Sequence, residues 1–232
     1  MKRFYKQAAA IEAEGGWTVA LDGKPIRTPK KSVFLAPTLS LAEAAAAEWE
    51  AQEDTVNPAA MPVTRGVNTA LDRTGPEYDA VVEIVAAYGG SDLLCYRADQ
   101  PDGLRARQAE GWDPLIGWAA EAHGARLLAT TGVMHILQPE DGQKALTDAV
   151  AGHDAFELTA LHDLVALSGS LVIGLAVSAG RLGAAEGWRL SRIDETWQEE
   201  FWGVDEEASK VAARKAREFA DAARFLDLTR QK

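Results

Sequence analysis

The chain has 232 residues and a formal net charge of −11, with 47% hydrophobic and 25% charged residues. This composition is typical of a folded globular protein, and the length fits one large domain or two unequal ones, since domains usually have about 100–200 residues. The acidic balance excludes a nucleic-acid binder unless its basic residues are strongly segregated, and it disfavours an anionic membrane surface. Both partners depend on Lys and Arg placed near phosphate groups.

The single cysteine, Cys95, excludes an internal disulfide and a metal site made of several cysteines. It lies in the apolar stretch 93–96, which predicts a buried and unreactive thiol. The most apolar run, residues 164–179, is interrupted by Ser168-Gly169-Ser170 and falls short of the about 20 residues of a membrane span. No apolar signal core follows the N-terminal residues. We therefore expect a protein of the reducing cytoplasm without membrane insertion.

The first 36 residues predict a small antiparallel sheet. Residues 17–21 alternate apolar with small or polar side chains and lead directly into Asp22-Gly23, which favours a two-residue hairpin turn. Residues 24–28 would form the return strand, beginning at Pro25 or lying on an edge, because proline cannot donate to a strand ladder. Two further short strands are predicted, at residues 3–7 and 32–35.

From residue 37 onward the pattern becomes helical. A cap at Thr38 or Ser40 opens an Ala-rich helix that runs through Trp49. Trp112-Asp113-Pro114 predicts the start of another helix, because Asp before Pro suits a cap followed by a first turn. A short extended piece interrupts the helices within residues 126–138. The other predicted helices span residues 61–72, 77–88, 141–151, 156–167, 168–183, 184–202 and 206–228.

These elements predict an α+β fold in two parts. A small antiparallel, β-rich N-terminal domain that ends in a helix would cover residues 1–60, and a larger, mostly α-helical domain would cover residues 61–232. Within the second part, the helix at 168–183 is apolar nearly all round, which is typical of the centre of a helical bundle. Gly174 would allow a neighbouring helix to approach this one closely.

Recognised catalytic motifs are absent from the sequence. It has no phosphate-binding loop, no dinucleotide-binding glycine pattern after a strand and no His-Glu-x-x-His, and its four histidines lack the spacing of metal ligands. His162-Asp163 comes closest to an acid–base pair, but adjacent positions on a helix point in different directions, which favours a surface or capping role. We therefore expect no enzymatic activity, no cofactor and no metal. Scattered carboxylates that meet in space leave one enzyme class open, a carboxylate-dependent hydrolase.

Residues 194–207 concentrate acidic and aromatic side chains. Seven of these fourteen residues are acidic and none is basic, and three are large aromatics, Trp197, Phe201 and Trp202. Residues 208–232 carry the opposite balance, with seven Lys or Arg against three acids. Charge is therefore segregated within the C-terminal stretch.

A single helix over residues 184–202 would have two distinct faces. One face collects apolar side chains and would pack on the core: Leu190, Ile193, Trp197 and Phe201. The nearly opposite face collects two tryptophans and two carboxylates: Trp188, Glu195, Glu199 and Trp202. Exposed tryptophans beside carboxylates are typical of a recognition surface, because Trp carries much of the energy of interface hot spots. The alternative interpretation is that the tryptophans pack beneath another helix while the acids form a solvated rim or pair with the basic last helix.

Short motifs along nearly the whole chain resemble a known family. They are Arg3-Phe4-Tyr5-Lys6, Leu21-Asp22-Gly23-Lys24-Pro25-Ile26-Arg27-Thr28-Pro29, Glu48-Trp49-x-x-Gln52, Met61-Pro62-x-Thr64, Ser91-Asp92-Leu93-Leu94-Cys95-Tyr96, Trp112-x-Pro114, Ser168-Gly169-Ser170 and Asp194-Glu195-x-x-Gln198 with Trp202-Gly203. Each motif is weak alone, and the ordered series is specific. On these residues the sequence resembles the assembly chaperones of the F-type ATP synthase catalytic sector, the Atp-twelve family. No presequence precedes the first motif, so a bacterial member is expected.

The resemblance implies a non-enzymatic role and a similar two-part architecture. Members of that family hold the unassembled α subunit, covering the surface that it later buries against the β subunit, until the α/β hexamer forms. The resemblance also implies an important carboxylate in the Asp-Glu-x-x-Gln stretch, for which Glu195 is the best match and Asp194 its neighbour. The predicted partner-binding residues are Trp188, Asp194, Glu195, Gln198, Glu199 and Trp202. The free protein is expected to be a monomer, and eukaryotic relatives are expected in the mitochondrial matrix.

Two other classes of protein remain as alternatives. A carboxylate-dependent hydrolase would bring acidic side chains together in a cleft and would turn over generic ester or phosphate substrates. A stable accessory subunit of a larger complex would co-purify with the assembled machine at fixed stoichiometry, whereas a chaperone would be absent from it. Neither alternative has a series of motifs behind it.

Overall fold

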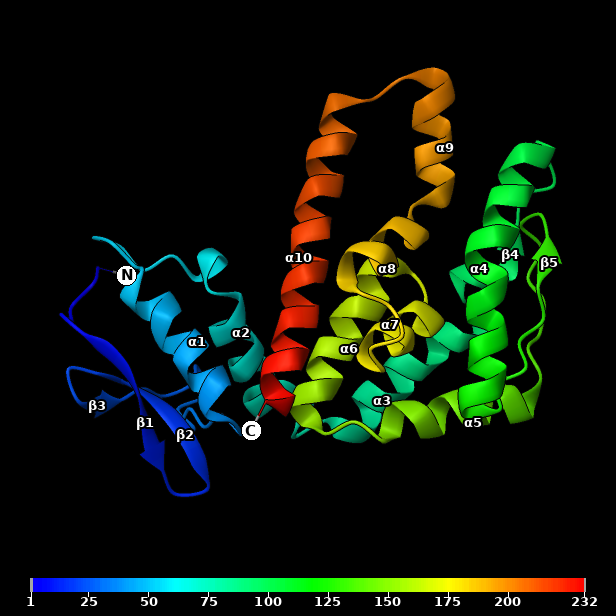
Figure 1. The fold of residues 1–232 in the computed structure, drawn as a ribbon. Coiled ribbons are helices and arrows are strands. Elements are labelled where there is room, and N and C mark those ends of the chain that lie inside the picture. Colours follow the sequence, from blue (N-terminus) through cyan, green and yellow to red (C-terminus); the bar gives the residue numbers. More distant parts are fainter. Residues whose placement is uncertain (1, 232) are drawn as a thin grey trace. The chain divides into compact units, whose positions relative to one another are not determined.

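The computed structural model describes residues 2–231 and shows a small antiparallel sheet followed by a mostly helical remainder (Figure 1). The predicted α+β class is confirmed. The chain forms two compact units. The first unit comprises residues 2–78, Asp154–Ala160 and 221–231, and the second comprises Asp79–His153 and Leu161–Ala220. The domain division predicted at residue 60 stays a prediction.

Three antiparallel strands form the sheet of the first unit: β1 (Ala8–Ala13), β2 (Gly16–Leu21) and β3 (Lys24–Pro25). The turn between β2 and β3 has φ values of 47° at Asp22 and 78° at Gly23. Two successive positive φ angles are the requirement of a type I′ turn, which glycine meets without strain. The hairpin predicted at this turn is confirmed, with Leu21 paired to Lys24.

The N-terminal strand lies later in the chain than predicted. Residues 3–7 form no regular strand, because the backbone N–H groups of Lys6 and Gln7 donate to the Asp22 carboxylate at 3.1 and 3.0 Å instead of to a ladder. The segment Ala8–Ala13 pairs with β2 in their place. Pairing across the short turn after β1 outweighs the weak strand propensity of alanine.

The strands predicted at residues 24–28 and 32–35 are wrong in extent. The first keeps only the two residues of β3, because Pro25 has no N–H to donate and the chain leaves the ladder soon afterwards. The second forms no strand, and one isolated bridge holds Val33. Phe34 is fully buried instead, so this segment contributes to the core of the first unit through packing.

Helix α1 (Leu39–Glu50) packs on β1 and β2 (Figure 1). Thr38 caps it, as predicted, and its hydroxyl accepts a hydrogen bond from the N–H of Leu41 at 3.2 Å. The face toward the sheet consists of small or branched apolar residues: Leu41, Ala42, Ala45 and Ala46. The Ala-rich pattern therefore marks the side of the helix that lies close to the strands.

The first unit continues through η1 (Pro58–Ala60), α2 (Pro62–Thr69) and the π-helical turn η2 (Ala70–Thr74). The helix predicted at residues 61–72 is thus α2 followed by a wider turn. That turn holds the buried Asp72, which accepts hydrogen bonds from the hydroxyl of Thr28 at 2.7 Å and from the N–H of Lys30 at 2.9 Å. The carboxylate ties the loop after β3 to the π-helical turn.

The rest of the chain is helical except for one short parallel strand pair. Its elements are α3 (Tyr78–Ala87), η3 (Tyr88–Ser91), η4 (Leu93–Cys95), β4 (Tyr96–Arg97), α4 (Asp102–His123), β5 (Thr130–Thr131), α5 (Glu140–Ala151), α6 (Ala155–Ser168), α7 (Leu171–Ser178), α8 (Ala184–Ser191), α9 (Ile193–Trp202) and α10 (Glu206–Arg230). The extended piece predicted within residues 126–138 is β5, which pairs with β4. Helices α6 and α10 contribute residues to both units.

Helix α7 is buried along its whole length in the second unit, as its apolar sequence predicts. The hydroxyl of Ser170 caps it by accepting from the N–H of Ile173 at 3.0 Å and donates to the carboxylate of Asp92 at 2.7 Å. Gly174 lets α6 approach, because an added Cβ would lie only 2.6 Å from the side chain of Val165. The close packing predicted at this glycine is confirmed.

Asp92 is fully buried at the start of α7. Besides the Ser170 hydroxyl, its carboxylate accepts from the N–H groups of Leu94 and Val172, each at 3.0 Å. Burial raises the pKa of Asp92, and these backbone hydrogen bonds act in the opposite direction. Cys95 lies nearby in the same core, so its predicted burial is confirmed, and burial raises the pKa of its thiol to about 12.

Helix α4 begins at Asp102, well before the start predicted at Trp112-Asp113-Pro114, and Pro114 lies inside it. That prediction is wrong because one face of the helix is buried from end to end, with Leu104, Gln108, Trp112, Leu115 and Ala119. The indole N–H of Trp112 also donates to the backbone carbonyl of Leu190 at 2.8 Å. This packing outweighs the loss of one helical hydrogen bond at the proline.

The helix predicted over residues 184–202 is two helices, α8 and α9. The chain breaks at Arg192, whose φ and ψ are −114° and 17°. The predicted core face is therefore only partly right, since Leu190 and Ile193 are buried whereas Phe201 is exposed. Both buried side chains pack against α4, and beyond them α9 follows a new direction that carries its later residues out of the core.

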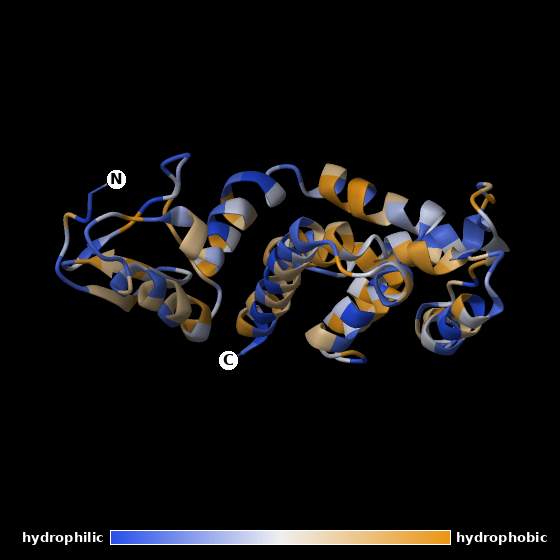
Figure 2. Cartoon of the chain, turned by 90° about the horizontal axis from the view of Figure 1, so that it is seen from above, coloured by the Kyte–Doolittle hydropathy of each residue, from blue (hydrophilic) through white to orange (hydrophobic). Residues whose placement is uncertain are grey.

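Helix α10 is amphipathic. In Figure 2 the helix that ends at the C-terminus alternates between hydrophilic and hydrophobic colours. Its buried side is made of apolar residues: Phe219, Ala222, Ala223, Phe225 and Leu226. In the first unit, an added Cβ at Gly66 of α2 would lie 2.5 Å from the Phe225 ring, so glycine at this position lets α2 and α10 meet.

Candidate functional site

Four of the predicted partner-binding residues share one side of α9. Glu195, Gln198, Glu199 and Trp202 follow one another at spacings of three and four residues, so they form one stripe along the helix. Glu195, Gln198 and Trp202 are exposed and Glu199 is half-buried. These four residues are called the α9 face below.

The two carboxylates of the α9 face share one guanidinium. Arg192 donates from Nη1 to Oε1 of Glu195 at 3.3 Å and from Nη2 to Oε1 of Glu199 at 3.1 Å. Arg192 is the residue between α8 and α9, so the change of helix direction places its guanidinium beside both carboxylates. Two carboxylates against one guanidinium leave the α9 face with a net negative charge.

The chain remains apolar and exposed beyond the end of the α9 face. Phe201, Trp202 and Val204 are 65%, 81% and 66% exposed, and they are called the apolar tip below. Gly203 makes the turn at a φ of 85°, and Asp205 caps the start of α10 (Figure 1). A cluster of large exposed apolar side chains of this kind marks an interaction site in a folded protein.

A second pair fastens α9 to α4. Arg107 donates to both carboxylate oxygens of Glu200, at 2.7 and 2.9 Å, and its guanidinium lies 4.7 Å from the ring centre of Trp197. The bidentate hydrogen bond lowers the pKa of Glu200 and raises that of Arg107. Trp197 in turn lies 4.8 Å, centre to centre, from the ring of Phe201. The apolar tip is therefore presented by a helix that α4 holds in place.

Asp194 lies off the α9 face, and Trp188 lies on α8, where the Arg192 guanidinium that binds Glu195 and Glu199 is 6.0 Å from its ring centre. The half-buried Trp188 packs against Phe219 of α10, with ring centres 5.9 Å apart. The carboxylate of Asp194 accepts from the side-chain amide of Gln108 in α4 at 2.6 Å, and Gln108 is buried. These contacts brace α8 and α9 against their neighbours, and the partner-binding role of both residues stays a prediction.

Sequence reasoning missed three features of this region. It assigned Phe201 to the core, although the run Phe201-Trp202-Gly203-Val204 between acidic residues is a signal for an exposed turn. It also missed Arg192 as a helix break, and no glycine or proline near that position indicates one. The pairing of Arg107 with Glu200 joins residues far apart in the chain, so no local pattern predicts it.

The described part of the chain, residues 2–231, offers no cluster of three or more His, Cys, Asp or Glu side chains placed to hold a metal ion. His162 and Asp163 form a pair with Nδ1 and Oδ1 3.0 Å apart, and both side chains reach solvent. The hydrogen bond contradicts the expectation that these two side chains point in different directions, and the surface or capping role of the pair stays a prediction. None of the helices in residues 2–231 combines the length and hydropathy that crossing a membrane requires.

Comparison with known proteins identifies the family. The model of the ATP12 chaperone protein family matches residues 2–120. The chain belongs to the ATP12 chaperone family. The family resemblance of the sequence motifs is thereby confirmed.

Solved structures extend the similarity over the whole of this ATP12 family member. Crystal structures of Atp12 from Paracoccus denitrificans, one of them of an Asp-to-Lys variant, are 48% identical, with a TM-score of 0.95 over 99% of this chain and 98% of theirs. A candidate chaperone from Agrobacterium tumefaciens is 42% identical, with a TM-score of 0.93 over 97% of this chain and 85% of its own. The mitochondrial atp12 protein of Schizosaccharomyces pombe is 21% identical over 222 residues, which are 90% of this chain and 76% of the yeast protein.

Proposed function

We propose that this protein is an assembly chaperone that binds the unassembled α subunit of the F-type ATP synthase catalytic sector. It covers the surface of α that later faces the β subunit, and it leaves when the α/β hexamer forms. Membership of a family of ATP synthase assembly chaperones supports the general role. The observation that carries the proposal is the exposed apolar tip next to the negatively charged α9 face. In this proposal the protein works in the cytoplasm as a monomer, without a cofactor and without catalysing a reaction.

The apolar tip supplies the apolar part of the proposed contact. A surface that a subunit will bury against a permanent neighbour is hydrophobic and prone to aggregate while it is exposed. Trp202 and Phe201 are large, and a folded helix already holds them outward, so little side-chain order is lost when they cover such a surface. The tip would therefore shield apolar surface on α.

The α9 face supplies the charged part of the contact. Glu195 and Glu199 are held by Arg192, so an Arg or Lys of the client would compete with that guanidinium for two carboxylates that are already positioned. Gln198 adds an exposed amide able to donate and accept. Charge pairs at an exposed edge are screened by salt over a Debye length of about 8–10 Å, which favours a reversible contact. Such a contact suits a chaperone that must yield to the β subunit.

Trp188 and Asp194 serve the proposed site indirectly. Trp188 packs α8 against α10, and the hydrogen bond of Asp194 holds the first turn of α9 on α4. We assign both to holding the α9 face in position, and we assign the direct carboxylate contact to Glu195. This choice makes Glu195 the residue to test.

Co-expression with the α subunit alone tests the proposal. We expect soluble α to be recovered only when this protein is present, and Glu195→Lys to lower that recovery strongly, because the substitution places a cation where a client cation should bind. The matched control is Glu83→Lys, the same charge change at an exposed position of α3. Thermal unfolding of both purified variants checks that they remain folded. If Glu195→Lys captures α as well as the control, the role assigned to Glu195 is wrong.

A further inference from the structure

Strand β1 (Figure 1) is one edge of the sheet in the first unit, because the strand order is β1-β2-β3. The N–H of Asp22 donates to the carbonyl of Gln7 at 2.9 Å, so these two residues form a hydrogen-bonded pair just before β1. Hydrogen-bonded pairs alternate with non-hydrogen-bonded pairs along an antiparallel ladder. The odd-numbered residues of β1 therefore bond to β2, and the even-numbered residues Ala8, Ala10 and Glu12 direct their N–H and C=O groups away from it.

Two residues of this edge have open backbone groups. The N–H of Ala8 donates to the Glu50 carboxylate at 2.7 Å, so the end of α1 closes that end of the strand. Within residues 2–231, the N–H and C=O groups of Ala10 and Glu12 have no hydrogen-bond partner, and they are called the β1 edge below. None of the six residues of β1 is buried, whereas the last four residues of β2 are. The β1 edge therefore reaches solvent.

The opposite edge of the same sheet is protected, and the β1 edge is not. Strand β3 consists of one lysine and one proline, and short strands, Lys and Pro are features that keep an edge from pairing with another chain. Strand β1 has six residues, about the usual length, and contains no Lys, Pro or Gly. It pairs with β2 without a bulge, and Glu12 is its one charged residue. An extended chain can add to such an edge as a further strand.

We propose that the β1 edge binds an extended segment of the client polypeptide, which pairs with β1 as an additional strand. Backbone groups of the segment bond to those of Ala10 and Glu12. The small side chain of Ala10 leaves room for a β-branched or aromatic residue opposite it, and Glu12 favours Lys or Arg opposite. The inference rests on the proposed function and deepens it, because it gives the β-rich first unit a part in holding the α subunit.

This contact suits an unassembled subunit. Such a subunit exposes surface that a permanent neighbour later buries, and an extended segment with unpaired backbone groups promotes aggregation. Pairing with β1 would occupy those groups until the neighbour arrives. Most of the affinity would come from main-chain hydrogen bonds, so the contact would make few demands on the side chains of the client.

A second copy of this chain fits the β1 edge less well. Because the N–H of Ala8 is occupied by Glu50, two antiparallel β1 strands would match Ala10 of each copy with Glu12 of the other. The two Glu12 carboxylates would then lie at diagonal positions on one face of the sheet, within reach of each other's repulsion. A client strand with Lys or Arg opposite Glu12 avoids this repulsion.

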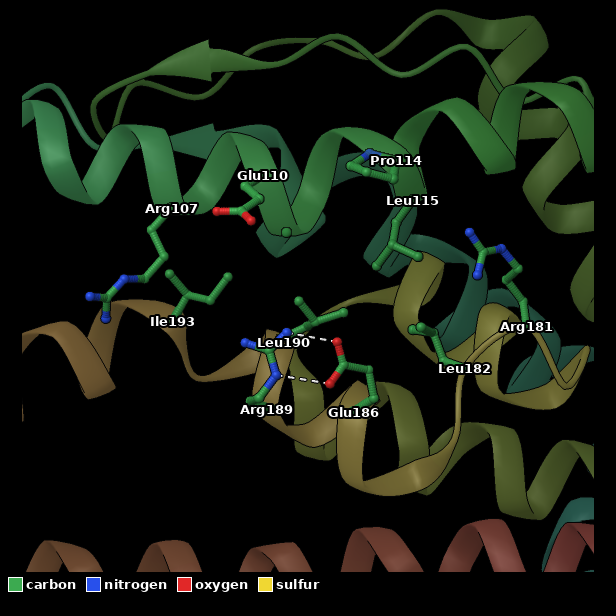
Figure 3. Close-up of a pocket in the computed structure, with 11 residues that line it drawn as sticks. Arg107, Glu110, Pro114, Leu115, Arg181, Leu182, Glu186, Arg189, Leu190 and Ile193 are labelled. Carbon is green, nitrogen blue, oxygen red and sulfur yellow. Dashed lines mark hydrogen bonds and ion pairs between the residues drawn. The ribbon is translucent and has the colours of Figure 1, made fainter.

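The cleft between α4 and α8 in the second unit, shown in Figure 3, is a different kind of surface. None of the residues that line it belongs to a strand. Its arginines are also balanced by carboxylates: Glu186 binds Arg189, Glu200 binds Arg107, and Glu110 adds a third negative charge. The cleft therefore selects no charged occupant and offers no ladder, and an extended client segment fits the β1 edge better.

Hydrogen–deuterium exchange of the full-length protein, alone and in complex with purified α subunit, tests the proposal. We expect the peptide that covers residues 8–13 to take up fewer deuterons in the complex at short labelling times, because the N–H groups of Ala10 and Glu12 become hydrogen-bonded. The N–H groups that already bond to β2 exchange slowly in both states and serve as the internal reference. This measurement needs no variant.

A proline substitution tests the backbone hydrogen bond itself. Ala10→Pro removes an N–H that faces away from β2, so the ladder with β2 remains. We expect it to weaken binding of α by about ten-fold, because it removes one hydrogen bond and places a ring at the edge. The matched control is Ala10→Thr, which keeps the N–H and should bind within a few-fold of the wild type. Thermal unfolding checks that both variants are folded.

The outcomes separate the two proposals. A complex with α in which exchange of residues 8–13 is unchanged, or equal affinities of the two Ala10 variants, overturns the β1 edge proposal and leaves the chaperone proposal standing. No complex with α overturns both. Protection of residues 8–13 that grows with the concentration of this protein in the absence of α shows pairing of two copies and also overturns the β1 edge proposal.

Discussion

Trp188 and Trp202 lie on neighbouring helices, and their surroundings are opposite. The half-buried Trp188 packs on Phe219 of α10, whereas Trp202 is exposed at the end of α9. Residues of the same type on neighbouring helices thus pack against another helix in one case and lie at the surface in the other. The difference arises at Arg192, where the chain changes direction between them. The residue type alone therefore does not show whether a tryptophan is packed or exposed, because the path of the backbone decides its surroundings.

Two carboxylates, Asp92 in the core of the second unit and Glu195 on the α9 face, show a similar contrast. Asp92 accepts three hydrogen bonds from the protein in a place without solvent. Glu195 has one long hydrogen bond, at 3.3 Å, and remains open to solvent. A buried carboxylate whose oxygens all accept hydrogen bonds from the protein stabilises the fold. An exposed carboxylate with few such hydrogen bonds remains available to a partner. The following predictions test this distinction.

The largest effect is expected at Asp92. Replacing Asp92 by Ala leaves the Ser170 hydroxyl and two backbone N–H groups without their acceptor, and each such buried donor costs about 1–3 kcal/mol. We expect the free energy of unfolding to fall by about 4 kcal/mol in chemical denaturation. Glu195→Ala is the control and should change it by less than about 0.5 kcal/mol. Equal losses of unfolding free energy in the two variants would show that the buried and the exposed carboxylate contribute equally to stability.

Trp188→Ala should have the next largest effect. Truncating a fully buried Trp costs about 3–5 kcal/mol, and Trp188 is half-buried, so a loss of about 2 kcal/mol in the free energy of unfolding is expected. Trp202→Ala should change stability by less than about 0.5 kcal/mol, because its ring is already in solvent. Denaturant titrations of both variants measure the difference, and a large loss in Trp202→Ala would show that the tip is part of the core.

Binding should reverse the order of these two tryptophans. Interface hot-spot residues contribute about 2 kcal/mol or more, so we expect Trp202→Ala to weaken binding of the α subunit by about thirty-fold. Trp188→Ala, assayed at a temperature where it is folded, should weaken binding less than Trp202→Ala does, because Trp188 acts on the α9 face only through its neighbours. Fluorescence anisotropy with labelled α measures both. Unchanged binding by Trp202→Ala would remove the apolar tip from the proposed contact.

The smallest effect is expected from acid titration of Glu200. The hydrogen bond from Arg107 lowers the pKa of Glu200 below its ordinary 4.5. The contribution of the pair to stability is therefore complete above that value and is lost as the pH falls through the lowered pKa. We expect the difference in unfolding free energy between the wild type and Glu200→Gln to be constant at neutral pH and to shrink in acid. A difference that grows on acidification would contradict the assigned pair.

The parts of the fold that depend on local sequence were predictable. The Asp22-Gly23 hairpin follows from two residues that tolerate positive φ, and the burial of α7 follows from a helix without a polar side. The start of α4 was mispredicted because Pro114 is a local signal for a helix start, and packing along the whole face of the helix overrides it. The strand at Ala8–Ala13 was missed for the same kind of reason, since its partner in β2 decides its conformation.

The candidate site was predictable in part. The spacing of Glu195, Glu199 and Trp202 correctly places them on one side of a helix, because all three lie within α9. The exposure of Phe201 and the contacts of Trp188 depend on the break at Arg192, which comes from packing of α8 and α9 on α4 and not from any residue that disfavours a helix. Tertiary packing therefore decides which side of each helix is buried, and the periodicity of a single helix does not.

The most direct test of the central claim is size-exclusion chromatography of the purified protein with purified α subunit, before and after addition of the β subunit. The account predicts a complex with α that disappears when β is added, leaving this protein alone and α in complexes with β. No complex with α would contradict the account. A complex that keeps this protein at fixed stoichiometry after β is added would also contradict it, because that result describes a permanent subunit.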